Sequence, residues 1–101
     1  MEVRFDPTIQ SYFNSSRALQ KRFGSLSKKL ILVVENLMKT RRADMMQIPG
    51  HPHPLRKYRN REIFSITVKH PFRCIFKVEP SGEFVTILNV VDYHNHEHRI
   101  L

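Results

Sequence analysis

The most constraining feature of the sequence is a set of three strand-length apolar segments separated by very short turns. The segments cover residues 63–68, 72–78 and 84–91, and they are rich in β-branched and aromatic side chains. Lys69-His70-Pro71 separates the first two, and a turn containing Pro80-Ser81-Gly82 separates the last two. Connections this short cannot cross over a sheet, so we expect neighbouring antiparallel strands.

Two helices are expected ahead of these strands. Asp6 and Pro7 suit a helix start, because an Asp side chain can accept hydrogen bonds from free amides and proline fits the first helical position. This first helix is expected to end near Ser16 or near Gly24. The second helix is predicted from apolar residues that recur on one helical face. They are Leu26, Leu30, Val33, Val34, Leu37 and Met38.

These elements together predict the fold class. Met1–Phe5 alternates weakly and fits a short edge strand. We therefore predict one α+β domain over residues 1–101, in which two N-terminal helices pack on a twisted antiparallel sheet. The expected order of elements is β-α-α-β-β-β.

The charge balance restricts the class of partner. Seventeen Lys and Arg residues against nine Asp and Glu give a formal net charge of +8, which favours a polyanion such as nucleic acid. An evenly solvated basic surface is the alternative. Cys74 is the single cysteine and falls within an apolar strand, so neither a disulfide nor a reactive thiol is expected. With no bilayer-length apolar run and no signal-peptide pattern, we expect a cytoplasmic protein without membrane association.

Residues able to perform acid–base chemistry stand at the edges of these elements. His53 lies in a proline-rich stretch that cannot be helical, and Asp92, Tyr93 and His94 follow the last apolar segment directly. Arg73 projects from the middle strand and needs an anionic partner, either a carboxylate such as Asp92 or a phosphate. Imidazoles and a phenol beside fixed cations suit metal-free RNA cleavage. One group takes the proton of the ribose 2′-hydroxyl, another protonates the leaving 5′-oxygen, and the cations stabilise the transition state.

A metal site is the competing interpretation of the histidines. His94, His96 and His98 alternate, so on a continuing strand they would share one face and could hold Zn²⁺. However, the tail after His94 lacks a strand pattern, and there is no set of cysteine ligands. We therefore expect no metal and no cofactor.

Five blocks of the sequence resemble a known family. They are His53-Pro54-Leu55-Arg56, a basic loop with Arg59, Phe64-Ser65-Ile66, Phe72-Arg73-Cys74-Ile75-Phe76, and Asp92-Tyr93-His94. In this order and spacing they resemble the HigB toxins of the RelE/ParE superfamily of toxin–antitoxin systems. The likeness spans residues 53–94. It implies a microbial RNase-like fold and a messenger-RNA interferase that cuts mRNA on the translating ribosome, held inactive by a cognate helix-turn-helix antitoxin.

The resemblance also implies a set of site residues. Catalytic residues would be His53, Arg56, Arg73, Tyr93 and His94, with Asp92 supporting them. Lys69 corresponds to a basic RNA-contacting position. By their charge we expect Lys57, Arg59 and Arg61 to bind RNA as well, and to act through affinity rather than turnover. We assign the 2′-hydroxyl proton to His94 or Tyr93, the opposite proton step to His53, and the scissile phosphate to Arg56 and Arg73.

The sequence departs from the family pattern at several points. Arg56 replaces the family's lysine, which keeps the charge but removes a plausible proton donor. Lys57-Tyr58 replaces a Gly-Asp turn, and phenylalanine replaces both tryptophans. Two alternatives therefore stay open, namely a non-nucleolytic inhibitor of the same fold, such as a ParE-like gyrase poison, and a basic RNA-binding module.

Overall fold

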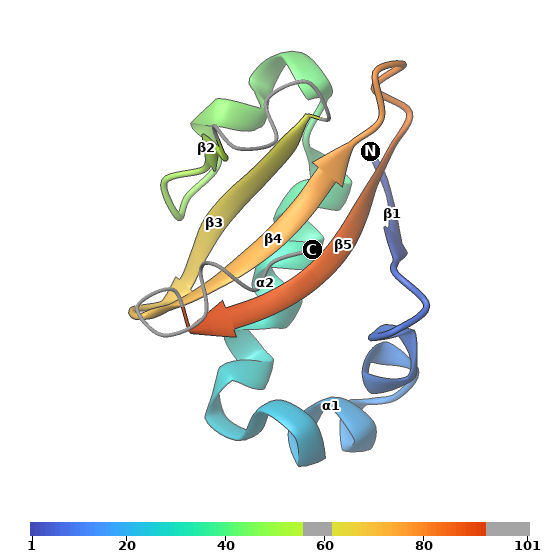
Figure 1. The fold of residues 1–101 in the computed structure, drawn as a ribbon, viewed down its shortest axis with the longest axis vertical. Coiled ribbons are helices and arrows are strands. Elements are labelled where there is room, and N and C mark those ends of the chain that lie inside the picture. The colour runs from blue at the N-terminus through green and yellow to red at the C-terminus, as the bar shows by residue number, and fades with distance from the viewer. Residues whose placement is uncertain (56–61, 93–101) are drawn as a thin grey trace.

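The protein is built around one five-stranded sheet (Figure 1). The computed structural model describes residues 1–55 and 62–92. The sheet order is β1-β5-β4-β3-β2. The strands are β1 (Glu2–Phe5), β2 (His53–Pro54), β3 (Ile63–Lys69), β4 (Phe72–Val78) and β5 (Phe84–Asp92). The three apolar segments predicted as neighbouring antiparallel strands are β3, β4 and β5, and that prediction is confirmed.

The sheet is mixed, however, and the prediction of a purely antiparallel sheet was wrong. The edge strand β1 was expected, but it pairs parallel to β5, with Glu2 opposite Phe84 and Phe5 opposite Ile87. A parallel pair needs a long connection between its strands. Here the helices and the other three strands lie between β1 and β5 in the sequence, so the chain can return in the same direction.

The helices also differ from the predicted order. Within residues 1–55 and 62–92 the helical elements are α1 (Ser16–Phe23), α2 (Ser27–Lys39) and three short 3₁₀ turns, at Gln10–Phe13, Gly24–Leu26 and Arg42–Gln47. No α-helix begins at Asp6, because its carboxylate instead accepts hydrogen bonds from the amide and hydroxyl of Thr8, at 2.9 and 2.7 Å. The first α-helix begins after Ser15, whose hydroxyl accepts from the amide of Ala18 at 3.1 Å.

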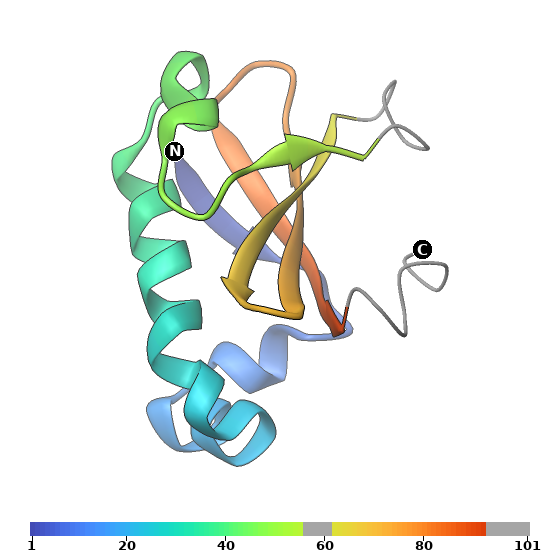
Figure 2. The same cartoon turned by 90° about the vertical axis from the view of Figure 1, so that its left-hand side faces the viewer.

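One face of the sheet, the helix face, packs against α2 (Figure 2). Leu30, Val33 and Leu37 of α2 are buried in one cluster with strand residues such as Ile66, Phe76 and Ile87. In contrast, α1 contributes a single buried side chain, Leu19, and lies toward one end of the sheet in Figure 1. The expected packing of two helices across the sheet is therefore replaced by one long helix.

A buried serine connects the two helices. The residue before α2 is Leu26, which makes no side-chain cap. The Ser27 hydroxyl is buried and donates to the carbonyls of Leu19 and Gly24, at 3.2 and 2.7 Å. It therefore ties α1 to α2.

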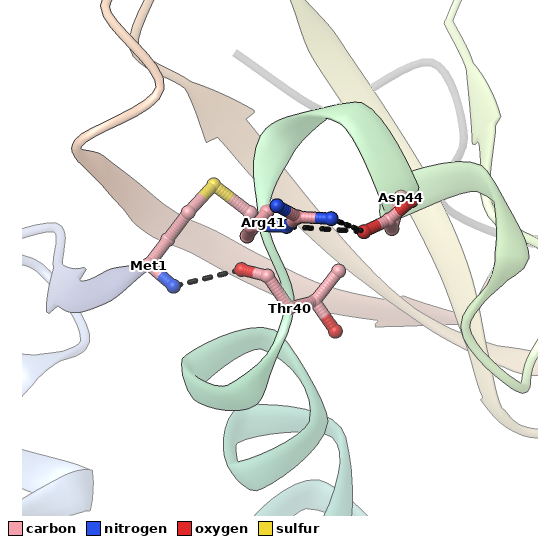
Figure 3. A network of polar contacts seen from close by, with 4 residues as sticks. All are labelled: Met1, Thr40, Arg41 and Asp44. Atoms are coloured by element: carbon pink, nitrogen blue, oxygen red, sulfur yellow. Dashed lines mark hydrogen bonds and ion pairs between the residues drawn. The ribbon is translucent and has the colours of Figure 1, made fainter.

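A polar network fixes the end of α2 to β1 (Figure 3). The Met1 ammonium group donates to the carbonyl oxygens of Thr40, Met38 and Leu37, at 2.8, 3.1 and 3.3 Å. Carbonyls at the end of a helix have no partner within the helix, and a cation there also interacts favourably with the negative end of the helix dipole. Beside it, Arg41 forms an ion pair with Asp44 at 3.2 Å.

No helix within residues 1–55 and 62–92 is long and apolar enough to cross a membrane.

Candidate active site

His53 and Arg73 come together on the far face of the sheet, which we define as the face pointing away from α2. His53 on β2 lies opposite Ser65 on β3, and Arg73 on β4 lies opposite Thr67 on β3. Directly opposed residues of an antiparallel pair share one face. His53, Ser65, Thr67 and Arg73 therefore belong to the same surface, and Phe64, Ile66 and Cys74 alternate onto the helix face.

The Arg73 guanidinium is held by four oxygen acceptors. Nε donates to the Ser65 hydroxyl at 2.9 Å, and Nη1 donates to the Thr67 hydroxyl at 2.6 Å. Nη2 donates to the carbonyls of His51 and Ser65, each at 3.1 Å. These contacts take up four of the five N–H groups of a guanidinium. From the sequence we expected an anionic partner for Arg73. The structure adds a set of neutral oxygens that already orients its side chain.

The environment of His53 changes its acid–base behaviour. Partial burial, followed by the positive charge of Arg73, lowers the pKa of the His53 imidazole, whereas a backbone hydrogen bond with Pro54 acts in the opposite direction. Both lowering effects disfavour the charged imidazolium. The neutral imidazole, which can accept a proton, is therefore favoured over the imidazolium, while the residue stays exposed to solvent.

The segment before β2 is fixed against β3 by backbone contacts. The Thr67 amide donates to the Gly50 carbonyl at 2.8 Å. Gly50 has φ +110°, and a Cβ added there would lie 2.7 Å from Cγ1 of Ile66 and 3.0 Å from the Thr67 carbonyl oxygen. Only glycine fits this approach without displacement, and it allows the His51 carbonyl to reach Arg73.

Asp92 and Lys69 are placed differently from His53. Asp92 lies opposite Phe72, so the register puts it on the opposite face from Arg73. It lines an open hollow of about 590 Å³ together with Arg22 and Phe23. The register therefore gives no support to the expected contact between Asp92 and Arg73. Lys69 is exposed at the end of β3, opposite Phe72.

Several expected site residues fall outside the described ranges. These are Arg56, Lys57, Arg59, Arg61, Tyr93 and His94, together with the alternating His96 and His98. Their roles stay predictions. Within the described ranges, no three His, Cys, Asp or Glu side chains are grouped closely enough to hold a metal ion.

Cys74 is confirmed as a core residue. It is 1% exposed on the helix face of β4, and burial raises the pKa of its thiol to about 12. The thiolate needed for nucleophilic chemistry is therefore suppressed.

The site residues that sequence reasoning missed are Ser65, Thr67 and the His51 carbonyl. The alternation of β3 already put Ser65 and Thr67 on the same face, opposite its apolar residues. Combined with the predicted antiparallel pairing of this strand with β4, the alternation places both hydroxyls near Arg73 once the register is known. By contrast, no pattern in the sequence predicts that the His51 carbonyl is an acceptor for Arg73.

Comparisons with known proteins identify the fold. No protein-family model matches the chain, and no curated protein matches it by sequence. Among solved structures, the chain is similar to part of the YoeB-YefM complex from Staphylococcus aureus, with 17% identity and a TM-score of 0.60 over 89% of this chain and 93% of that one. It is also similar to a YoeB/ParE toxin from Agrobacterium tumefaciens, with 16% identity and a TM-score of 0.63 over 89% and 95%. The E. coli DinJ-YafQ complex gives 14% identity and a TM-score of 0.63 over 92% and 93%.

This chain has the fold of the YoeB and YafQ structures. At these identities the similarity concerns the fold alone, and it does not single out HigB.

Proposed function

We propose that this chain is the toxin of a type II toxin–antitoxin system and acts as a HigB-like mRNA interferase, a ribosome-dependent endoribonuclease that needs no metal. The observation that carries the proposal is the pairing of His53 with the oriented Arg73 cation on the far face. A group that accepts a proton beside a fixed positive charge suits attack of a ribose 2′-hydroxyl on the adjacent phosphate.

The chemistry follows from these two side chains. His53 accepts the proton of the 2′-hydroxyl, since its lowered pKa favours the neutral imidazole. The 2′-oxygen then forms a bond to phosphorus, and the bond from phosphorus to the 5′-oxygen breaks. Arg73 stabilises negative charge on the phosphoryl oxygens, and a second acid protonates the leaving 5′-oxygen. This reverses the role of His53 assigned from the sequence alone, and gives the acid role to His94 or Tyr93.

The chain's charge supports RNA as the substrate. Its formal net charge of +8 attracts a polyanion, and we propose that Lys57, Arg59, Arg61 and Lys69 contribute affinity, with Arg56 beside the scissile phosphate. We further propose a cognate antitoxin with a helix-turn-helix domain as the partner. Two solved structures of similar fold are described as a YoeB-YefM toxin–antitoxin complex and a DinJ-YafQ complex.

The test is induced expression in a growing bacterium, with growth and mRNA 5′ ends followed together. The parent chain is compared with His53→Ala and His94→Ala, and with Gln20→Ala on the exposed surface of α1 as a matched control. We expect growth arrest and new mRNA ends for the parent and the control, and neither for the histidine variants. Incubation of mRNA with the purified chain, with and without ribosomes, tests the ribosome requirement.

A second candidate is a toxin that inhibits by binding, and one observation favours it. The Agrobacterium structure of similar fold is described as a YoeB/ParE toxin. Growth arrest with intact mRNA would therefore replace the interferase by a ParE-like inhibitor. No arrest at all would favour a basic RNA-binding module.

A further inference from the structure

Ser65 is an unusual residue for its position on β3. Its side chain is 0% exposed, whereas Ile63 and Ile66 beside it on the same strand are buried apolar residues. A buried hydroxyl is unfavourable unless it is hydrogen-bonded. Its partner is Nε of Arg73, at 2.9 Å. A buried position on β3 is therefore occupied by a polar residue whose hydroxyl hydrogen-bonds Arg73.

Thr67 completes the arrangement from the same strand. Arg73 lies opposite Thr67, and its side chain extends back along β3 so that the guanidinium meets both hydroxyls. The carbonyls of Ser65 and His51 accept from Nη2. We call these four oxygens the Arg73 cradle. Acceptors on all three nitrogens of a planar guanidinium fix its plane as well as its position.

The cradle is itself held in place. The His51 carbonyl belongs to a segment joined to β3 by the hydrogen bond from the Thr67 amide to the Gly50 carbonyl. His51 has φ +54°, a conformation that non-glycine residues seldom adopt without support from their surroundings. The other three acceptors lie on a central strand of the sheet. The orientation of Arg73 is therefore built into the folded protein.

This arrangement matters for the neighbouring imidazole. His53 lies opposite Ser65, so the cradle and the imidazole are in adjacent positions on the far face. We propose that Ser65 and Thr67 are positioning residues, which hold the Arg73 guanidinium in one orientation so that its charge acts on His53 and on a phosphodiester bound beside them. The part that concerns the phosphodiester rests on the proposed function, and the part that concerns His53 does not.

A competing explanation is that the cradle only attaches residues 50–52 to the sheet. Loss of a hydroxyl would then lower stability and leave His53 unaffected. The two explanations differ in the titration of His53, which depends on where the cation lies and not on how stable the fold is.

The experiment compares Thr67→Val with Thr67→Ser in the full chain. Valine keeps the shape and the β-branching but removes the acceptor, whereas serine keeps the hydroxyl. His53 is titrated by NMR, and its resonance is assigned with His53→Gln. We expect the pKa of His53 to rise in Thr67→Val, because the loss of one of the four acceptors leaves Arg73 less tightly held, and to stay at the parental value in Thr67→Ser. An unchanged His53 titration in Thr67→Val, with Arg73 still present, would overturn the proposal.

Cleavage kinetics test the second part. We expect kcat to fall about ten- to hundredfold in Thr67→Val with little change in KM, and to be restored in Thr67→Ser. Equal kcat values for the parent and Thr67→Val would overturn the role toward the phosphodiester. A parent chain that cuts no RNA would contradict the proposed function alone, since the His53 titration would still decide whether the cradle orients Arg73.

Discussion

The two faces of strands β3, β4 and β5 differ in composition: the helix face is apolar, and the far face combines a smaller apolar cluster with polar residues. On the helix face, Ile66, Phe76 and Ile87 are completely buried in a large apolar cluster with α2. On the far face, a smaller cluster around Ile75 and Ile63 lies beside the polar group formed by Ser65, Thr67 and Arg73. The helix face holds the larger apolar cluster, and the far face carries the candidate site.

The difference teaches how closely stability and the candidate site are connected. Side chains alternate between faces along each strand, so Ile66 and Ser65 are neighbours in sequence but face opposite ways. A shift of register by one residue would exchange the two faces. The packing of Ile66 and Phe76 under α2 therefore fixes the register that brings Ser65 and Thr67 to Arg73.

The largest expected loss of stability comes from a substitution in the core of the helix face. Phe76 is 0% exposed and its ring packs against that of Phe64 at 5.9 Å. We expect Phe76→Ala to lower the free energy of unfolding by about 3–5 kcal/mol, because it leaves a cavity in the main core. Lys77→Ala, at the next position on β4 and exposed, should change it by less than about 0.5 kcal/mol. Equilibrium urea unfolding measures both, and similar losses would contradict the division between the faces.

The second largest loss of stability is expected at Gly50, which contacts both Ile66 of the helix face and the backbone of Thr67. In Gly50→Ala, the new methyl group would meet Ile66 of the helix face and the backbone of Thr67, at a residue with φ +110°. We expect a loss of about 2–4 kcal/mol, from the backbone conformation and the steric overlap together. Gly24→Ala is the matched control, since Gly24 also has positive φ but nothing within 4 Å of an added Cβ. Its expected cost is about 1–2 kcal/mol, and equal costs would show that the contact with Ile66 can relax.

The third effect is confined to the far face. Ser65→Ala removes the hydroxyl that accepts from Nε of Arg73 and leaves the strand otherwise unchanged. We expect the free energy of unfolding to fall by about 1–3 kcal/mol, the usual range for leaving a hydrogen-bonding group inside the protein without its partner. Thermal unfolding of the parent and the variant gives the difference. A variant as stable as the parent would mean that water or another oxygen replaces the hydroxyl.

Much of the fold could be predicted from the sequence because local rules determine it. The short turns required β3, β4 and β5 to be antiparallel neighbours, and the apolar spacing predicted α2 to within a residue or two. The parallel pairing of β1 with β5 could not be predicted in this way. It joins the two ends of the described chain, and four residues of weak alternation contain no information about which strand they will meet.

The predicted start of the first helix was wrong for a local reason. Asp6 and Pro7 suit a helix start and a turn almost equally well, and the hydrogen bonds that Thr8 donates to the Asp6 carboxylate select the turn. At the site, the alternation of β3 and β4 put Ser65, Thr67 and Arg73 on one face. The hydrogen bonds among them required the register, and the contribution of His51 required the conformation of a loop.

The smallest effect uses pH to probe the contact between His53 and Arg73. Burial and the Arg73 charge lower the pKa of His53 in the folded protein, so the unfolded chain binds more protons near its own value of about 6.5. The folded protein therefore loses stability as the pH falls through about 6.5 toward the folded pKa, and above about 6.5 the imidazole is neutral in both states and has no such effect. Urea midpoints between pH 8 and pH 5 should therefore fall more steeply for the parent than for His53→Gln, which lacks this group. The difference in slope should shrink when both are built on Thr67→Val, because Arg73 is then less tightly held. Parallel curves for the parent and His53→Gln would show that the far face does not place this cation beside the imidazole.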